Sequence, residues 1–313
     1  MKTVPAPDKR RWFTTLAGSL GLLQLVMVVC YEFYKNATVI YLFGSSFLTK
    51  PAHRYECLDD ATGNWNECSK EEICSKGIPG DHYRPIPDDE YIDNWVSQDK
   101  FDLLCEPKYK VGLIGSVYFI GVVTTVMLYP IISDRCAGRR YVFLITGVIF
   151  AIAFLGLILA TDLIWCYVFM FIMGTCWGGR IIVGMNYVLE LNNPEYTKTL
   201  VFLFLITEPI ILILLTFWYQ FIDNSWKLIS IITLCLIIVT LLVYWLFVPE
   251  SAKWLYTWKH FDEARQVIRE ISSFNGVESQ QIRRDVLSKK FYKEEEAMDA
   301  MSRSNRTLRD DMP

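Results

Sequence analysis

Long apolar runs, separated by short polar segments, dominate the chain from residue 110 onward. A helix that crosses the hydrocarbon core of a bilayer needs about 20 apolar residues. Five runs meet this length, at 111–132, 141–160, 163–187, 199–221 and 228–248. A sixth apolar segment, 12–48, is too long for one straight span and must tilt, kink or project. Because soluble helices seldom stay apolar on all faces for this length, the pattern predicts an all-α membrane protein with six transmembrane helices.

The charges of the connecting segments predict the orientation of these helices. Basic residues precede the first span, fill the connection 133–140 and recur after residue 250, whereas the segment 49–109 is strongly acidic. Basic loops stay on the cytoplasmic side of a membrane. We therefore expect a multi-pass protein of the plasma membrane with cytoplasmic termini, an extracellular segment 49–109 and a cytoplasmic segment 1–11. No small-residue cleavage site follows the first apolar run, so we expect no signal peptide.

Four of the nine cysteines lie in the acidic segment. An even number of cysteines in an extracellular segment favours two disulfides, for which three pairings exist. Zinc is the weaker alternative, because the spacing contains no CxxC element. The disulfide candidates are Cys57, Cys68, Cys74 and Cys105.

Several short motifs then follow one another along the chain. They are FDLLC at 101–105, SDRCAGRR at 133–140, ELNNPEYTK at 190–198, SWK at 225–227 and VPES at 248–251. In this order they resemble the organic cation, organic anion and carnitine transporter branch of the major facilitator superfamily, the solute carrier family 22 type. The resemblance covers roughly 10–280 and implies the six-helix amino-terminal half of the major facilitator fold.

The resemblance also implies a function, with two departures. Transporters of this type move small organic solutes by rocking two six-helix halves against each other. Pro130 stands where the family has a glycine, and no further set of six spans follows residue 248. We therefore keep two interpretations: a secondary transporter of organic ions represented by its amino-terminal half, and a non-transporting half-bundle or truncated product that assembles with another membrane protein. A second membrane protein or the missing carboxy-terminal half is accordingly a candidate partner.

Charged residues inside the apolar spans are the candidates for substrate or ion binding. A charge in mid-bilayer costs about 2.5 kcal/mol or more unless it is paired or hydrated. Glu32 and Lys35 lie three residues apart on one helical face. Arg180 and Glu208 lie at similar depth and could form an ion pair between the fourth and fifth spans. For both couples, a purely structural ion pair is the alternative.

A second group of charges lies at the expected cytoplasmic ends of the helices. The resemblance implies a gate of ion pairs there, and a solvated basic turn is the alternative. Its members are Asp134, Arg135, Arg139, Arg140, Glu190 and Glu250. Beyond it, apolar residues at helical spacing predict short amphipathic helices within 251–280, and 281–313 reads as a charged, partly disordered tail.

Other functional classes lack their motifs. The chain contains no GxxxxGK phosphate-binding string and no Gly-x-Ser-x-Gly nucleophile, and its three histidines are scattered. We therefore expect no enzyme activity, cofactor, metal site or nucleic-acid partner. The expected partners are the lipid bilayer and a small organic solute. Gly174 and Gly178, at GxxxG spacing, predict close packing of the fourth helix.

Overall fold

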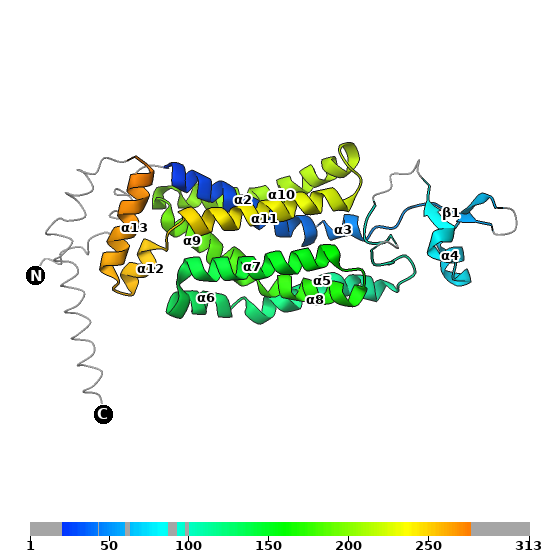
Figure 1. The fold of residues 1–313 in the computed structure, drawn as a ribbon, viewed down its shortest axis with the longest axis horizontal. Helices are drawn as coiled ribbons and strands as arrows, with labels where there is room; N and C mark the ends of the chain where they lie inside the picture. Colours follow the sequence, from blue (N-terminus) through cyan, green and yellow to red (C-terminus); the bar gives the residue numbers. More distant parts are fainter. Residues whose placement is uncertain (1–20, 43, 60–62, 87–92, 98–99, 277–313) are drawn as a thin grey trace, which may run out of the picture. The chain divides into compact units, whose positions relative to one another are not determined.

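The computed structural model describes residues 21–42, 44–59, 63–86, 93–97 and 100–276 (Figure 1). Its contacts divide the chain into two compact units. The first comprises Met1–Val26, Leu189–Thr197 and Pro249–Pro313, and the second comprises Met27–Val188 and Lys198–Val248.

Apolar helices make up most of the second unit. In the described residues, five helical stretches are long and apolar enough to cross a membrane. One of them, Lys108–Leu159, has 52 residues and is interrupted at Gly138, whose φ of 79° lies in the left-handed region that favours glycine. The chain reverses there, so this stretch supplies two antiparallel segments (Figure 1). The helical elements are α2 (Leu22–Leu42), α3 (Ser45–Leu48), α5 (Lys108–Thr125), α6 (Leu128–Ile132), the π-helical turn η2 (Ser133–Ala137), α7 (Gly138–Leu159), α8 (Leu163–Thr175), the π-helical turn η3 (Gly178–Val183), α9 (Gly184–Leu191), α10 (Thr197–Phe221) and α11 (Trp226–Phe247).

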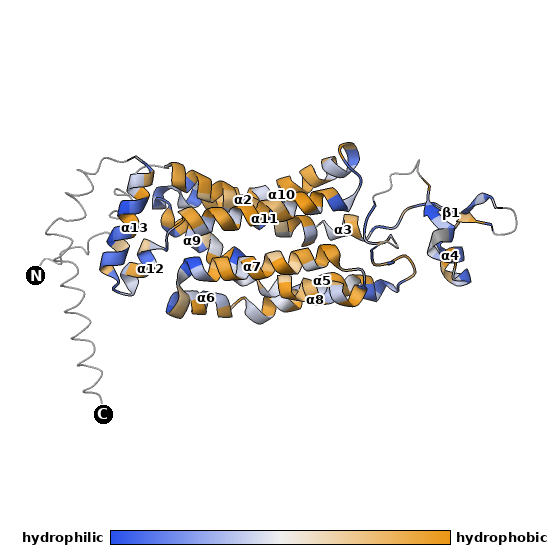
Figure 2. Cartoon of the chain, viewed as in Figure 1, coloured by the Kyte–Doolittle hydropathy of each residue, from blue (hydrophilic) through white to orange (hydrophobic). Residues whose placement is uncertain are grey.

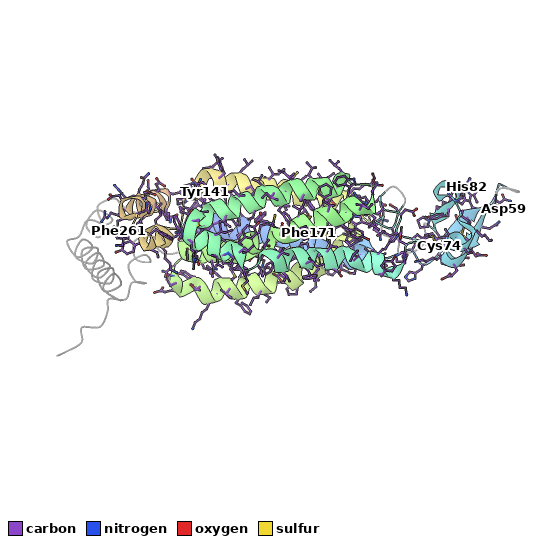
Figure 3. All side chains as sticks on the ribbon, turned by 90° about the horizontal axis from the view of Figure 1, so that it is seen from below. Asp59, Cys74, His82, Tyr141, Phe171 and Phe261 are labelled. Carbon is purple, nitrogen blue, oxygen red and sulfur yellow. A yellow bond between two sulfur atoms is a disulfide. The ribbon has the colours of Figure 1, made fainter. Side chains whose placement is uncertain are left out.

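Hydropathy distinguishes the long helices from two shorter ones. The long helices are apolar along most of their length, whereas α4 (Lys70–Lys76) and α13 (Phe261–Phe274) are largely hydrophilic (Figure 2). Apolar side chains such as Tyr141 and Phe171 remain exposed on the long helices (Figure 3). Such exposure suits a protein whose solvent is lipid.

Glycines allow α5 and α8 to approach closely. A Cβ atom on Gly174 would lie 2.1 Å from the carbonyl oxygen of Tyr118, and one on Gly121 would lie 2.4 Å from that of Phe171. Any larger residue would push the two helices apart. The packing role predicted for the GxxxG pair is confirmed at Gly174, and a Cβ atom on Gly178 would also be tight, at 3.2 Å from the carbonyl oxygen of Thr125.

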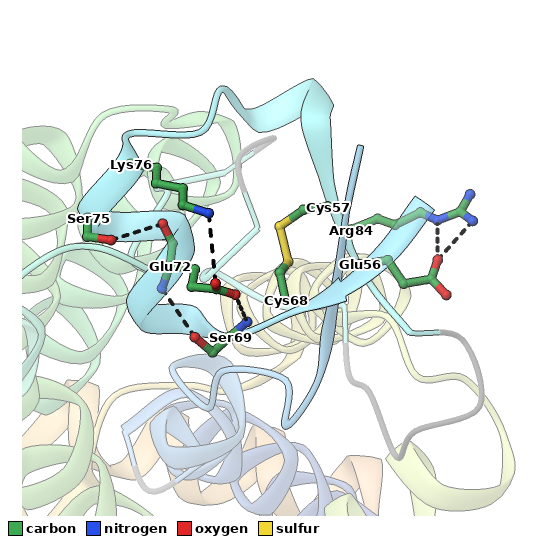
Figure 4. Close-up of a disulfide and its surroundings, with 8 residues drawn as sticks. All are labelled: Glu56, Cys57, Cys68, Ser69, Glu72, Ser75, Lys76 and Arg84. Atoms are coloured by element: carbon green, nitrogen blue, oxygen red, sulfur yellow. Dashed lines mark hydrogen bonds and ion pairs between the residues drawn. A yellow bond between two sulfur atoms is a disulfide. The ribbon is translucent and has the colours of Figure 1, made fainter. Parts of the chain in front are cut away.

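The segment between α3 and α5 contains a small sheet that the sequence did not predict. Strands β1 (Tyr55–Leu58), β2 (Trp65–Cys68) and β3 (Tyr83–Pro85) pair antiparallel in the order β2-β1-β3. The two predicted disulfides are confirmed, and the pairing is Cys57–Cys68 and Cys74–Cys105. The first joins β1 to β2 directly (Figure 4).

Polar contacts complete this sheet. Glu56 on β1 accepts two hydrogen bonds of 3.0 Å from Arg84 on β3. The Ser69 hydroxyl accepts from the backbone N–H of Glu72, and the Glu72 carboxylate accepts from the N–H of Ser69 (Figure 4). This reciprocal pair is a capping box, which fixes the start of α4 immediately after β2.

The first unit contains α12 (Ala252–Thr257), the amphipathic helix α13 and the turn η4 (Pro194–Tyr196). Helix α13 buries Ala264, Val267, Ile268 and Ile271 on one face. Asn275, which follows it, donates to Gln24 at 2.8 Å and accepts from the backbone N–H of Leu23 at 3.2 Å. The predictions for 1–11 and 281–313 lie outside the described residues.

Candidate functional site

Three of the four charges predicted inside the membrane meet between α2 and α10. The Nζ atom of Lys35 lies 3.5 Å from Oε2 of Glu32, on the same helix, and 3.8 Å from Oε1 of Glu208, on α10. Lys35 therefore links two carboxylates that belong to different helices. We call the three residues, with Asn36 and Thr207, the α2–α10 cluster.

Neutral side chains hold the Glu32 carboxylate in place. The hydroxyl of Thr207 donates to Oε2 of Glu32 at 2.6 Å and accepts from Lys35 at 3.1 Å. The amide of Asn36 donates to the same Oε2 at 3.0 Å and to the Glu32 carbonyl at 2.9 Å. Neither Thr207 nor Asn36 was predicted from the sequence as a site residue. The sequence offered one signal for each: Thr207 directly precedes Glu208, and Asn36 follows Glu32 by four residues, one helical turn.

Lys35 also contacts the backbone of α10. Its ammonium group donates to the carbonyl oxygen of Phe204 and lies 5.7 Å from the centre of that ring. Glu208 is followed by Pro209, which has no N–H and so cannot donate to the Leu205 carbonyl four residues earlier. Lys35 thus binds α10 one residue away from the carbonyl that the proline leaves without its helical partner.

The exposed fraction of the charged side chains increases across the cluster. It is 3% for Lys35, 14% for Glu32 and 40% for Glu208. The cluster is thus closed at Lys35 and open at Glu208. Because a carboxylate exposed within a membrane-spanning helix needs water or a polar partner, its open side is the candidate for solute contact.

Arg180 lies on a different side of α2. It is fully buried and donates to the carbonyl oxygen of Tyr34 at 2.7 Å. Its guanidinium carbon lies 4.2 Å from the ring centre of Tyr34 and 3.4 Å from that of Phe150. The ion pair of Glu208 is formed with Lys35 and not, as the sequence suggested, with Arg180. Arg180 and Glu208 lie at similar depth, but their side chains point in different directions around their helices.

The predicted cytoplasmic charges divide between the two units. In the second unit, Asp134 forms an ion pair with Arg139, and Arg140 donates to the Trp245 carbonyl at 2.6 Å, while Arg135 is exposed. In the first unit, Glu190 accepts from the Ser251 hydroxyl at 2.7 Å and lies 3.6 Å from Lys253, and Glu250 accepts from the Ser251 N–H at 2.8 Å. A gate that joins the basic turn to these two acids stays a prediction.

Asp93 and Lys100 connect the cysteine-rich segment to the ends of the long helices. The backbone N–H of Asp93 donates to Asn224 at 2.8 Å, its carbonyl accepts from the N–H of Trp226 at 3.1 Å, and its carboxylate accepts from the Ser225 hydroxyl at 2.9 Å. This contact fastens the segment to the α10–α11 connection, which contains part of the SWK motif.

Lys100 closes the end of α7. Its ammonium group donates to the carbonyl oxygens of Leu157, Ile158 and Ala160 at 2.8, 2.8 and 2.6 Å. Burial lowers the pKa of this lysine from 10.5 to about 8, with a smaller contribution from the nearby charge of Lys227. The role of Lys100 was not apparent from the sequence, where a lysine in a polar segment is unremarkable.

Comparison with known proteins decides the family. Residues 44–309 match the model of the family described as "Sugar (and other) transporter", which is more than half of the chain. The chain belongs to this family. Its membership confirms the predicted fold class, that of a family of membrane transporters.

Individual relatives include solute carriers of the predicted branch. Solute carrier family 22 member 2 of Rattus norvegicus is 25% identical over 177 residues, which cover 56% of this chain and 31% of the relative. Organic cation/carnitine transporter 2 of Rattus norvegicus is 25% identical over 188 residues, which cover 57% and 32%. The predicted resemblance is confirmed, and the chain spans about a third of the length of these relatives.

Among solved structures, the xylose transporter XylE from E. coli, in a partially occluded inward-open conformation, matches 84% of this chain and 57% of that chain. The TM-score is 0.49 and the sequence identity 16%.

Proposed function

We propose that the chain takes part in secondary transport of small organic solutes, with the α2–α10 cluster facing the solute pathway. The observation that carries the proposal is the 40% exposure of Glu208 within a membrane-spanning helix, beside the buried Lys35. A charge facing lipid at this depth is costly. Water or a polar solute on the open side of Glu208 removes that cost.

The family supports this assignment. Two relatives carry names of the solute carrier 22 type, one of them an organic cation/carnitine transporter, so organic ions are the proposed solute class. Alternating access needs a second wall opposite α2 and α10, because the pathway of such transporters lies between two helical halves. We assign that wall to further transporter sequence or to a second membrane protein. The proposed location is the plasma membrane, with both termini cytoplasmic.

The alternative is a half-bundle that binds a membrane partner without transporting. The apolar surface of α10 favours it, because only 17% of the most apolar part of Pro194–Phe221, the stretch that contains α10, is buried. Exposed side chains on α10 include Phe202, Leu205, Ile213, Leu214 and Phe217. A partner helix packed against α10 would cover this surface and would also provide the polar partner that Glu208 needs.

Uptake by membrane vesicles separates the two functions. The chain is expressed in cells, and vesicles are assayed with labelled organic cations, carnitine and organic anions. We expect uptake above that of empty vesicles and its loss in Glu208→Gln. The matched control is Glu195→Gln, which removes an exposed carboxylate from the η4 turn and should leave uptake unchanged. Uptake equal to that of empty vesicles, together with co-purification of a membrane protein, would support the half-bundle.

A further inference from the structure

The outward faces of α7 and α11, two helices in contact with each other, carry apolar stripes. Exposed side chains recur on each helix at alternating steps of four and three residues, a spacing that places them on one face. On α7 the stripe consists of Tyr141, Ile145, Val148, Ile152, Leu155 and Leu159. The same spacing leads from Leu228 to Trp245 on α11. The α7 stripe is about 27 Å long, close to the thickness of about 30 Å of a hydrocarbon core.

Positive charge collects at one end of these stripes. The connection 133–140 contains three arginines and one aspartate, a formal charge of +2. Arg139 forms an ion pair with Asp134 inside the turn. The other two positive charges of the segment belong to Arg135, which is exposed on η2, and to Arg140, near the start of α7.

The opposite end of the two helices carries a different set of charges. There, Lys227 on α11 lies 3.8 Å from the carboxylate of Asp93, and Asp162 stands in the connection between α7 and α8. The excess of positive charge is thus a feature of the 133–140 end.

Aromatic side chains flank the arginines at this end. Arg140 donates to the carbonyl oxygen of Trp245 at 2.6 Å, which joins the start of α7 to the end of α11. The side chains of Tyr141, labelled in Figure 3, and Trp245 are both exposed. Tyrosine and tryptophan prefer the boundary between hydrocarbon and headgroups. Arg135 and Arg140 therefore belong at the level of the headgroups.

This arrangement selects the ligand. Acyl chains suit two apolar stripes, and a guanidinium group presents several donors to a phosphate in a geometry that fits it. The ammonium group of a zwitterionic headgroup would be repelled by the arginines, whereas an anionic headgroup has no such group or has it balanced. We propose that Arg135, Arg140, Tyr141 and Trp245 form a binding site for an anionic phospholipid, with its phosphate on the two arginines and its acyl chains along the stripes.

The site accords with the orientation proposed above and does not depend on solute transport. Anionic lipids belong to the cytoplasmic leaflet, and 133–140 lies on the side that we propose to be cytoplasmic. Two other roles for the same residues make different predictions. If Arg135 only orients the helices, another exposed cation such as Lys198, in the first turn of α10, should attract lipid equally well. If a protein covers the stripes, lipid should not reach Trp245.

Native mass spectrometry of the purified full chain in neutral detergent measures lipid retention. We expect phosphatidylglycerol to be retained at a lower concentration than phosphatidylcholine. Arg135→Gln should weaken this retention about fivefold, Arg135→Gln/Arg140→Gln should weaken it further, and the control Lys198→Gln should leave it unchanged. Arg135 is exposed, so its variant should keep the fold, which thermal unfolding checks.

Two results of this titration would overturn the site. Equal weakening by Lys198→Gln would show a general attraction between cations and anionic lipid. Displacement of the lipid by glycerol phosphate, which has no acyl chains, would show a site for free anions instead of a phospholipid.

Quenching by brominated lipids in nanodiscs locates the bound lipid. The difference between the native chain and Trp245→Phe isolates the fluorescence of Trp245. We expect brominated phosphatidylglycerol to quench it more than brominated phosphatidylcholine, and Arg135→Gln to remove this preference. Trp165, exposed near the start of α8, is the matched control and should show no preference. Equal quenching of Trp245 by both lipids would reject headgroup recognition. No quenching at Trp245 would assign the stripes to a protein partner and reject the lipid.

Discussion

Lys35 on α2 lies 3.8 Å from Glu208 on α10, and this ion pair joins two helices that are about 170 residues apart in the sequence. The two partners differ in burial, with exposed fractions of 3% and 40%. The consequences of removing either partner should therefore differ.

Lys35→Met should destabilise the chain more than Glu208→Gln. The first change leaves the Glu32 carboxylate without its cation in a largely buried position, and breaking a fully buried pair costs about 3–5 kcal/mol. The second change leaves Lys35 with Glu32, Thr207 and the Phe204 carbonyl as partners. The Glu208 side chain itself is 40% exposed, so its position is partly solvated. Thermal unfolding in detergent measures both. Equal losses would show that the pair contributes little beyond its hydrogen bonds.

Gly121→Ala should disrupt the packing of α5 on α8, whereas Gly115→Ala should not. A Cβ atom at 121 would lie 2.4 Å from the Phe171 carbonyl oxygen, a backbone atom that cannot rotate away. At 115 no atom lies within 4 Å, and both positions are on α5, so they form a matched pair. We expect a loss of about 1–3 kcal/mol at 121 and almost none at 115. Unfolding temperature and the yield of folded protein measure the difference, and similar values for both variants would contradict the close approach.

These two sites show what the sequence could and could not reveal. A charge inside an apolar run is conspicuous, and so Glu32, Lys35 and Glu208 were identified as site candidates. Thr207 and Asn36 were missed because small neutral polar residues are ordinary in membrane helices. The predicted ion pair between Glu208 and Arg180 was wrong, because tertiary packing determines which side chains of two helices face each other. The depth of a residue in its span does not reveal this.

The cysteine-rich segment shows the same limit. Four cysteines predicted two disulfides, but their pairing depends on which strands lie side by side. Strands of three or four residues, such as β3 and β1, are too short for an alternating pattern to be recognised. Lys100 was missed for a further reason, since its partners are backbone carbonyls at the end of α7, which have no sequence signature.

Lys100→Met should loosen the end of α7. Three carbonyl oxygens lose their donor, and each buried acceptor without a partner costs about 1–3 kcal/mol. Lys100→Arg keeps the charge and the donors but not the compact shape of the ammonium group, so we expect an intermediate loss. Hydrogen exchange of the amides near residue 160, together with thermal unfolding, measures the effect. Unchanged exchange in the methionine variant would show that water replaces the lysine.

The pKa of Lys100 predicts a pH dependence of stability. Burial lowers this pKa to about 8 in the folded chain, against 10.5 for an ordinary lysine. Between these two values the unfolded chain binds the proton and the folded chain does not, so stability should rise with pH across this window. Below about pH 8, both states carry the charge and the slope should vanish. The difference in unfolding temperature between the native chain and Lys100→Met, measured from pH 7.5 to 10.5, isolates this residue. A difference that stays constant with pH would mean that the carbonyl partners keep the lysine charged throughout.

Loss of the Cys74–Cys105 disulfide should destabilise the chain more than loss of Cys57–Cys68. A crosslink restricts the unfolded chain more as the loop that it closes lengthens, and the sequence separations are 31 and 11 residues. The chain-entropy relation gives about 3.7 and 2.8 kcal/mol for the two loops, a difference of about 1 kcal/mol. The longer loop also contains Asp93, which holds the α10–α11 connection through Ser225. The paired serine variants Cys74→Ser/Cys105→Ser and Cys57→Ser/Cys68→Ser are compared by thermal unfolding under non-reducing conditions, with the reduced native chain as reference. A larger loss in the second variant would show that the sheet, and not the closed loop, dominates the stability of this segment.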